Sequence, residues 1–247
     1  MSVFCINKTY SFKIQPQEVD FRYNISIAAL TNLLLTTAGY NADENGFGIR
    51  KLNENACSWV LLRLAVDMQK FPQQYDEIHI ETWVEHVGRA STVRNFRIID
   101  KEGIEIAKAT SNWAMINIHT RRAQDLSTLD GIQQHATGQK IEMEAPVKLK
   151  PVNTVPCQSF DVKYSHIDIN GHVSSMRYLE WVCDCLTPDF YSRNDIRRFE
   201  LNFINEILYG DKVSVKYEES TQNDFSFEII KNNTEACRAR IVFENKN

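Results

Sequence analysis

Three side chains that can move protons or hold an anion, Asp168, Asn170 and His172, stand at alternate positions in the second half of the chain. Alternate side chains of an extended segment lie on one face. The spacing therefore predicts that a carboxylate, an amide and an imidazole converge. An amphipathic stretch over residues 174–186 follows directly, and the free backbone N–H groups at a helix start favour negative charge. Such an arrangement suits acyl chemistry.

The same residue types allow other interpretations. Asp168 could simply cap a turn or a helix entry. His166, Asp168 and His172 could ligate zinc, but no fourth ligand is evident, so we expect neither a metal nor a cofactor. Cys183 and Cys185 could act as nucleophiles, yet both lie in the apolar stretch, where small buried thiols are common. We expect these two cysteines to pack in the core.

The first half of the chain repeats this frame with most of the chemistry missing. Residues 11–14 match residues 159–162, and Asp20 matches Asp168, both at an offset of 148 (159 − 11 and 168 − 20). At this offset Asn170 corresponds to Arg22, and His172 corresponds to Asn24. An internal duplication of this kind indicates two similar structural units.

The repeat continues beyond the motif at a smaller offset. Residues 76–83 resemble residues 211–217 at an offset of 135 (211 − 76), so the second copy is 13 residues shorter in between (148 − 135). Residues 41–55 are rich in Asn and Gly and have no clear counterpart. We therefore expect a loop there in the first half.

Composition limits the classes of function. The chain has 247 residues, of which 43% are hydrophobic and 24% are charged, and its net charge is −4. These values fit a globular protein and give no reason to expect nucleic acid binding. No apolar run approaches the length of a membrane span, and the N-terminal residues lack a signal-peptide pattern. We expect a cytoplasmic protein that does not contact membranes, either a monomer or a homodimer.

The pattern of each half predicts a strand, a long helix and a run of strands. Residues 25–38 and 176–186 have the apolar spacing of buried helices, with Ser26 as a candidate cap. Alternation predicts strands at residues 78–85, 92–99, 104–118, 212–218, 225–230 and 236–243. Residues 127–156 hold three of the six prolines and little periodicity, which indicates a linker. The predicted domains are residues 1–126 and 157–247.

Motifs spread over nearly the whole chain resemble those of the acyl-acyl carrier protein thioesterases. The residues that carry the resemblance are 59–63 (Trp-Val-Leu-Leu-Arg), Pro72, Tyr75, Asp76, 81–83 (Glu-Thr-Trp), Asp168, Asn170, His172, Val173, Tyr178 and Trp181. The resemblance implies an α+β fold, a tandem (double) hot-dog in which each half is an antiparallel sheet wrapped around one long helix. It also implies hydrolysis of the acyl thioester and an acyl carrier protein as partner.

The resemblance adds a fourth residue to the catalytic set. The family's second-half carboxylate matches Glu206, so the implied set is Asp168, Asn170, His172 and Glu206. Many plant members have a cysteine after this glutamate, where this chain has Ile207. Two asparagines usual after His-Val are Ser174 and Ser175 here. The absence of a plant transit peptide suggests a bacterial enzyme.

Thioester hydrolysis assigns a role to each member of the set. Asp168 could attack the carbonyl directly or deprotonate water as a general base, and the sequence leaves both open. We assign Asn170 to positioning, His172 and Glu206 to water and proton handling, and the backbone N–H groups of residues 173–175 to the oxyanion. A free imidazole titrates near pH ~6.5, which suits proton exchange at neutral pH.

The half without the catalytic residues is free to hold the acyl chain. Leu30, Leu33, Leu34 and Trp59 are the predicted substrate-binding residues, because an apolar helix facing a sheet could part to admit a tail. Alternative functions are an acyl-coenzyme A thioesterase, a hot-dog dehydratase and a non-catalytic lipid-binding module. The three functional side chains at residues 168–172 argue against the last of these.

Overall fold

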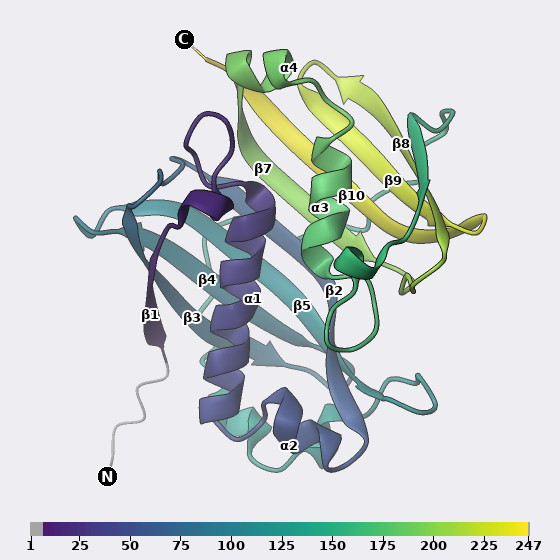
Figure 1. Ribbon diagram of the computed structural model, residues 1–247. Coiled ribbons are helices and arrows are strands. Elements are labelled where there is room, and N and C mark those ends of the chain that lie inside the picture. The colour runs from purple at the N-terminus through teal and green to yellow at the C-terminus, as the bar shows by residue number, and fades with distance from the viewer. Residues whose placement is uncertain (1–6, 247) are drawn as a thin grey trace. The chain divides into compact units, whose positions relative to one another are not determined.

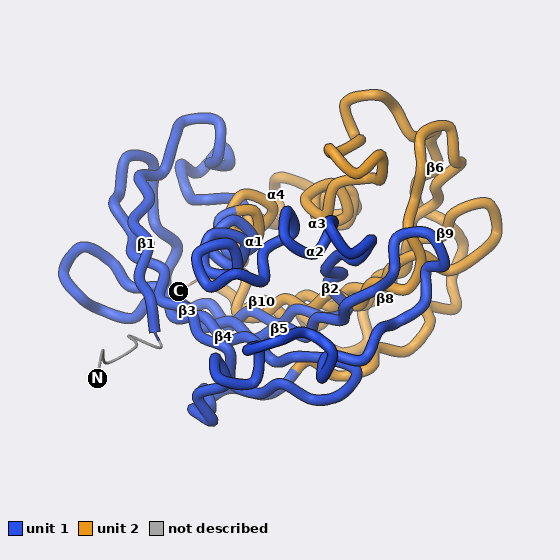
Figure 2. Tube along the Cα trace, turned by 90° about the horizontal axis from the view of Figure 1, so that it is seen from below, with its two compact units in different colours: residues 1–26, 33–145 blue, residues 27–32, 146–247 orange. Residues whose placement is uncertain are grey.

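The computed structural model describes residues 7–246. These residues group into two compact units by their internal contacts, coloured separately in Figure 2. Unit 1 comprises residues up to Ser26 together with residues 33–145, and unit 2 comprises residues 27–32 together with residues from Pro146 onward. The first turns of one helix are therefore grouped with unit 2.

Unit 1 is an antiparallel sheet with one long helix across it (Figure 1). Its strands run in the order β1-β3-β4-β5-β2. The elements are β1 (Lys8–Lys13), η1 (Pro16–Glu18), α1 (Ile27–Glu44), α2 (Ile49–Asn53), β2 (Cys57–Met68), β3 (Glu77–Val87), β4 (Thr92–Asp100), β5 (Glu105–Asn117), η2 (Leu126–Thr128) and η3 (Ile132–His135).

Helix α1 forms because its sequence is rich in Ala and Leu and buries a stripe at three- and four-residue spacing. The buried residues of the stripe are Ile27, Leu30, Thr31, Leu34, Thr37, Ala38, Asn41 and Ala42. This spacing puts one face of the helix into the core along its whole length.

Unit 2 repeats the arrangement with a shorter helix, α3, across its sheet (Figure 1). The strand order is β7-β10-β9-β8-β6, again antiparallel. The elements are β6 (Gln158–Asp161), η4 (Tyr164–His166), α3 (Ser175–Cys183), α4 (Pro188–Arg193), β7 (Asn194–Phe203), β8 (Lys212–Thr221), β9 (Asp224–Lys231) and β10 (Thr234–Asn245). Two sets of five antiparallel strands within one ten-stranded sheet, each set with one helix across it, confirm the predicted tandem hot-dog.

Three element predictions differ from the structure. Residues 41–55 are not a simple loop, because α1 continues to Glu44 and α2 follows. Strands β2 and β7 were not predicted, since their long apolar or mixed runs lack clean alternation. Helix α4 was also missed, although Thr187 caps it by accepting a hydrogen bond from the Phe190 N–H and Pro188 stands at its first position.

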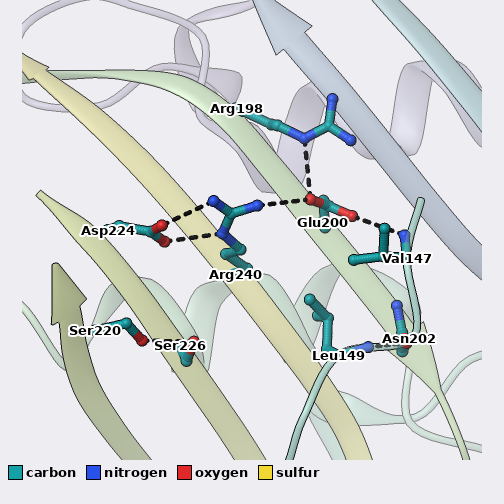
Figure 3. A network of polar contacts seen from close by, with 9 residues as sticks. All are labelled: Val147, Leu149, Arg198, Glu200, Asn202, Ser220, Asp224, Ser226 and Arg240. Atoms are coloured by element: carbon teal, nitrogen blue, oxygen red, sulfur yellow. Dashed lines mark hydrogen bonds and ion pairs between the residues drawn. The ribbon is translucent and has the colours of Figure 1, made fainter. Parts of the chain in front are cut away.

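The predicted linker is ordered where it adjoins each unit. Ala136 forms a parallel bridge to Val84, and Trp83 Nε1 donates a hydrogen bond of 2.8 Å to the Gln139 carbonyl. Further on, Figure 3 shows the backbone at Leu149 held against unit 2, where its N–H donates to Asn202 Oδ1 at 3.0 Å. The Leu149 side chain is buried. These contacts tie residues 136–139 to unit 1 and residue 149 to unit 2.

A buried carboxylate organises the sheet of unit 2 beside this segment (Figure 3). Glu200 is 1% exposed, and its Oε1 accepts hydrogen bonds from Arg198 Nε at 3.0 Å and Arg240 Nη1 at 3.4 Å. Arg240 also donates two hydrogen bonds to Asp224, and this interaction raises the pKa of Arg240. The Val147 N–H donates to Glu200 Oε2 at 3.2 Å.

Candidate functional site

The segment from Asp168 to His172 is a tight turn, so the prediction of an extended segment is wrong. The Asp168 N–H donates to the His172 carbonyl at 2.8 Å, and the Gly171 N–H donates to the Asp168 carbonyl at 3.1 Å. Gly171 has φ +78°, a left-handed conformation that glycine adopts without strain. The turn reverses the chain, whereas an extended segment would have aligned the three side chains on one face.

Asp168 is half-buried and holds the turn through one carboxylate oxygen. Its Oδ1 accepts hydrogen bonds from the backbone N–H of Asn170 at 2.8 Å and from that of His172 at 3.4 Å. The other oxygen, Oδ2, takes no part in these bonds. The turn-capping interpretation of Asp168 is therefore correct for Oδ1, and it is compatible with a chemical role for Oδ2.

His172 lies beside Glu206, which is 34 positions away in the sequence (206 − 172). An antiparallel bridge joins His172 to Leu208, and the Val173 N–H donates to the Ile207 carbonyl at 2.8 Å. His172 Nε2 is thereby placed 3.4 Å from Glu206 Oε2. These side chains are 28% and 38% exposed, so a substrate and water can reach both.

Lys231 and Asp211, neither of them a predicted site residue, support the Glu206 backbone. Lys231 Nζ donates a hydrogen bond to the Glu206 carbonyl and lies 3.9 Å from Asp211 Oδ2. Asp211 Oδ2 in turn accepts from the Leu208 N–H at 2.9 Å. The repeat contained a signal for Asp211, because its counterpart Asp76 is also an aspartate.

The backbone N–H groups at the start of α3, from residues 173 to 176, fall into two bonded groups and two unbonded ones. The Val173 N–H is already donated to Ile207, and the Ser174 N–H donates to the His166 carbonyl at 2.9 Å. The assignment of these two groups to an oxyanion is therefore wrong. Ser174 is the N-cap residue, but its side chain makes no capping hydrogen bond. Within residues 7–246, the N–H groups of Ser175 and Met176 make no hydrogen bond, and they are available to an oxyanion.

The first half folds into the same turn with different side chains. The matching bonds are Asp20 N–H to Asn24 carbonyl (2.7 Å), Tyr23 N–H to Asp20 carbonyl (3.0 Å), Ile25 N–H to Pro72 carbonyl (2.9 Å) and Ser26 N–H to Glu18 carbonyl (2.9 Å). Asp20 Oδ2 accepts from Arg22 Nε at 3.0 Å. Asn24 replaces His172, and Phe71 stands in place of Glu206 (206 − 135). The first copy therefore keeps the backbone hydrogen bonds of the turn and lacks the imidazole–carboxylate pair.

His166 does not join Asp168 and His172 in a metal site. No group of three or more His, Cys, Asp or Glu side chains is placed to hold a metal ion in the part of the chain that the structure describes. His166 Nδ1 accepts a hydrogen bond from the Lys163 N–H at 3.1 Å, and its ring packs edge-on against Trp181. Burial, aided by nearby Arg177, lowers the pKa of His166.

The four predicted substrate-binding residues differ in environment. Leu30, Leu33 and Leu34 on α1 are 0%, 7% and 0% exposed. Trp59 on β2 is half-buried, and its Nε1 donates to the Phe47 carbonyl at 2.8 Å. Trp59 also packs against a cluster of buried side chains of unit 1. An acyl-binding role for these residues stays a prediction.

No helix within residues 7–246 is long and apolar enough to cross a membrane.

Comparisons with known proteins match both halves of the chain. The model of the acyl-ACP thioesterase N-terminal domain matches residues 7–129, and that of the acyl-ACP thioesterase C-terminal domain matches residues 149–245. The crystal structure of an acyl-ACP thioesterase from Bacteroides thetaiotaomicron is 39% identical in sequence, with a TM-score of 0.91, over 97% of this chain and 98% of that one.

Plant proteins are more distant relatives. The 12:0-ACP thioesterase from Umbellularia californica is 20% identical over 100% of both chains with a TM-score of 0.87, which shows the fold. The chloroplastic oleoyl-acyl carrier protein thioesterase of Coriandrum sativum is 26% identical over 92% of this chain and 67% of its own length. For two such Arabidopsis thaliana proteins the chain spans 63% and 61% of their length.

Proposed function

Because the chain belongs to the acyl-ACP thioesterase family, we propose that it hydrolyses fatty acyl-acyl carrier protein, releasing a free fatty acid and the carrier's thiol and so ending fatty acid synthesis. The observation that carries this proposal beyond family membership is the pairing of His172 Nε2 with Glu206 Oε2 at 3.4 Å, next to the anchored carboxylate of Asp168. The pair is built from residues distant in the sequence and lies in unit 2.

Asp168 acts as the nucleophile or as the general base in this proposal. Because Oδ1 is occupied by two backbone N–H groups, the carboxylate is held in one orientation and Oδ2 remains for the substrate or for water. Oδ2 either attacks the thioester carbonyl to give a mixed anhydride or takes a proton from the attacking water. Both routes use the ionised carboxylate.

His172 and Glu206 handle protons in this scheme. The Glu206 carboxylate stabilises the imidazolium form of His172, which protonates the departing thiolate. His172 regains its proton from the water that hydrolyses the anhydride in the first route, and from Asp168 in the second. Asn170 contributes its backbone N–H to the orientation of Asp168. We assign the developing oxyanion to the N–H groups of Ser175 and Met176, where the dipole of α3 adds to the two hydrogen bonds.

The acyl chain is assigned to the first half of the molecule. Support comes from three buried leucines on α1 (Leu30, Leu33 and Leu34), and from the half-buried Trp59. We place the reaction in the cytoplasm because the chain is similar to the bacterial enzyme from Bacteroides thetaiotaomicron. The plant relatives are chloroplastic. A monomer or a homodimer remains the prediction for the assembly.

The proposal is tested by supplying purified protein with acyl chains of several lengths, each as the acyl carrier protein thioester and as the coenzyme A thioester. Released fatty acid is measured by mass spectrometry. Faster release from the carrier protein at matched concentration supports the proposal. Faster release from coenzyme A would make the chain an acyl-coenzyme A thioesterase, and binding without release of acid from either donor would contradict hydrolysis altogether.

A further inference from the structure

Two thiols of unit 2 lie next to each other across the start of β6 and the end of α3. Cys157 precedes β6, Cys185 follows α3, and their sulfur atoms are 3.2 Å apart. The sequence predicts that Cys183 and Cys185 pack in the core. Instead Cys185 and Cys183 are half-buried, and Cys157 is exposed.

Surrounding contacts hold both cysteines in place. The Cys157 N–H donates to the Val215 carbonyl at 2.9 Å, which joins the start of β6 to β8. Gln158 Nε2 donates to the Trp181 carbonyl at 2.6 Å and approaches Cys185 Sγ at 3.4 Å. The sulfur atoms therefore face each other because the strand and the helix are already fastened together. A disulfide of ~2.05 Å needs them to move about 1 Å closer.

We propose that Cys157 and Cys185 are a modification site at which a low-molecular-weight disulfide, such as oxidised glutathione, forms a reversible intramolecular disulfide. The two cysteines differ in the way that stepwise exchange requires. Cys157 is exposed to the oxidant. Cys185 is shielded, and burial together with the hydrogen bond to Cys157 raises the pKa of its thiol, so it reacts second.

The exchange balances without a further reactant. Cys157 loses its proton to solvent, and its thiolate attacks one sulfur of the oxidant, forming a mixed disulfide and releasing one small thiol. Cys185 then loses its proton and attacks Cys157 Sγ, which expels the second small thiol. The two cysteines are oxidised, and one small disulfide is reduced to two thiols.

The bond would enclose the catalytic segment. Residues 157–185 include the whole Asp168–His172 turn and α3. A cross-link over this span stabilises the fold chiefly by restricting the unfolded chain. The pair is specific to the second half, because the positions at an offset of 148 are Thr9 and Thr37.

The test treats reduced full-length protein with oxidised glutathione, blocks the remaining thiols without reduction and maps the linked peptides by mass spectrometry. We expect a Cys157–Cys185 peptide pair, loss of two of the six thiols, and a melting temperature roughly 5–10 °C higher that dithiothreitol reverses. Cys185→Ser should instead accumulate glutathione on Cys157. Cys57→Ser, which removes a half-buried cysteine of unit 1, should still form the link.

Two results would overturn the proposal. One is a wild-type protein that keeps glutathione on Cys157, or keeps both thiols reduced, under conditions that oxidise a dithiol standard. The other is an unchanged rise in melting temperature in Cys185→Ser. Neither result bears on thioester hydrolysis, which is measured separately through fatty acid release. Fatty acid is also the better product to follow, because aromatic disulfide reagents for released thiol would react with Cys157.

Discussion

Asp168 uses its two carboxylate oxygens for different purposes. Oδ1 closes the turn by accepting hydrogen bonds from two backbone N–H groups, and we assign the reaction to Oδ2. An asparagine can keep the first function, because its amide oxygen also accepts hydrogen bonds, but it supplies no base and a far weaker nucleophile. The conservative variant therefore separates the fold of the turn from its reactivity.

Removing either member of the imidazole–carboxylate pair should slow turnover much more than it lowers stability. We expect His172→Ala and Glu206→Ala each to reduce kcat by ~10²–10⁴, the usual contribution of general acid–base catalysis. Fatty acid release and thermal melts measure the two effects. Asn24→Ala, at the position that matches His172, should keep wild-type turnover. Folded variants of His172 and Glu206 with normal turnover would remove the pair from the mechanism.

Lys231 is expected to act by positioning Glu206. Its ammonium holds the Glu206 carbonyl, so Lys231→Met should let the carboxylate drift and lower kcat by roughly 10- to 100-fold, as small misplacements do. Lys231→Arg should recover part of the loss.

The matched control for Lys231 is Lys70→Met. Lys70 directly precedes Phe71, the counterpart of Glu206, and its ammonium lies 3.7 Å from Asp100 Oδ2. Its replacement should leave kcat unaltered. A similar loss of activity in both methionine variants would show that the effect does not run through Glu206.

Among the elements, the local sequence pattern predicted the two long helices, α1 and α3, and most strands, but it missed α2 and α4. The spacing of Met176, Leu179 and Val182 gave α3, although the helix ends at Cys183 and not at Leu186. The turn at Gly171 was anticipated only as the alternative interpretation of Asp168, because alternation of side-chain type does not encode a left-handed glycine. The contact between His172 and Glu206 came only through family resemblance, since a bridge between segments 34 positions apart has no local signature.

The strands of unit 2 depend on the buried Glu200. Glu200→Gln would leave the guanidinium groups of Arg198 and Arg240 without their shared carboxylate, and we expect the free energy of unfolding to fall by roughly 3 kcal/mol. Urea unfolding measures this loss. Glu244→Gln removes a half-exposed partner of Arg197 and should cost less than about 1 kcal/mol. Equal losses would mean that Glu200 contributes no more than a surface ion pair.

Helix α1 is where the acyl-chain proposal can be tested. Leu34 is 0% exposed, and Leu34→Trp adds volume to the proposed pocket, so the preferred acyl chain should become shorter. The product profile over a series of acyl carrier protein substrates measures the change. Ile229→Trp on β9 of unit 2, where Ile229 is also 0% exposed, imposes a similar overpacking cost of ~1–3 kcal/mol outside the first half and should keep the wild-type profile. Identical profiles in both variants would place the acyl tail elsewhere.

At the scale of the whole molecule, duplication separates what the fold requires from what the reaction requires. Both copies close the same turn with the same backbone hydrogen bonds, so the turn itself belongs to the fold. Only the second copy has an imidazole and a facing carboxylate, at His172 and Glu206. The sequence contained this division from the start, because the offset of 148 aligned Asp20 with Asp168. It could not show that the two turns share one geometry.

The most direct test of this account compares Asp168→Asn with Asp20→Asn. Both changes keep an oxygen that can cap the turn, but Asp20 Oδ2 is already paired with Arg22 Nη2 at 3.0 Å, so this oxygen is occupied by a guanidinium and is not left for water or substrate. We predict that Asp168→Asn abolishes fatty acid release with an unchanged melting temperature. Asp20→Asn should keep turnover and at most lower the melting temperature. Equal loss of activity in the two folded variants would contradict the account, because it would make the first half catalytic as well.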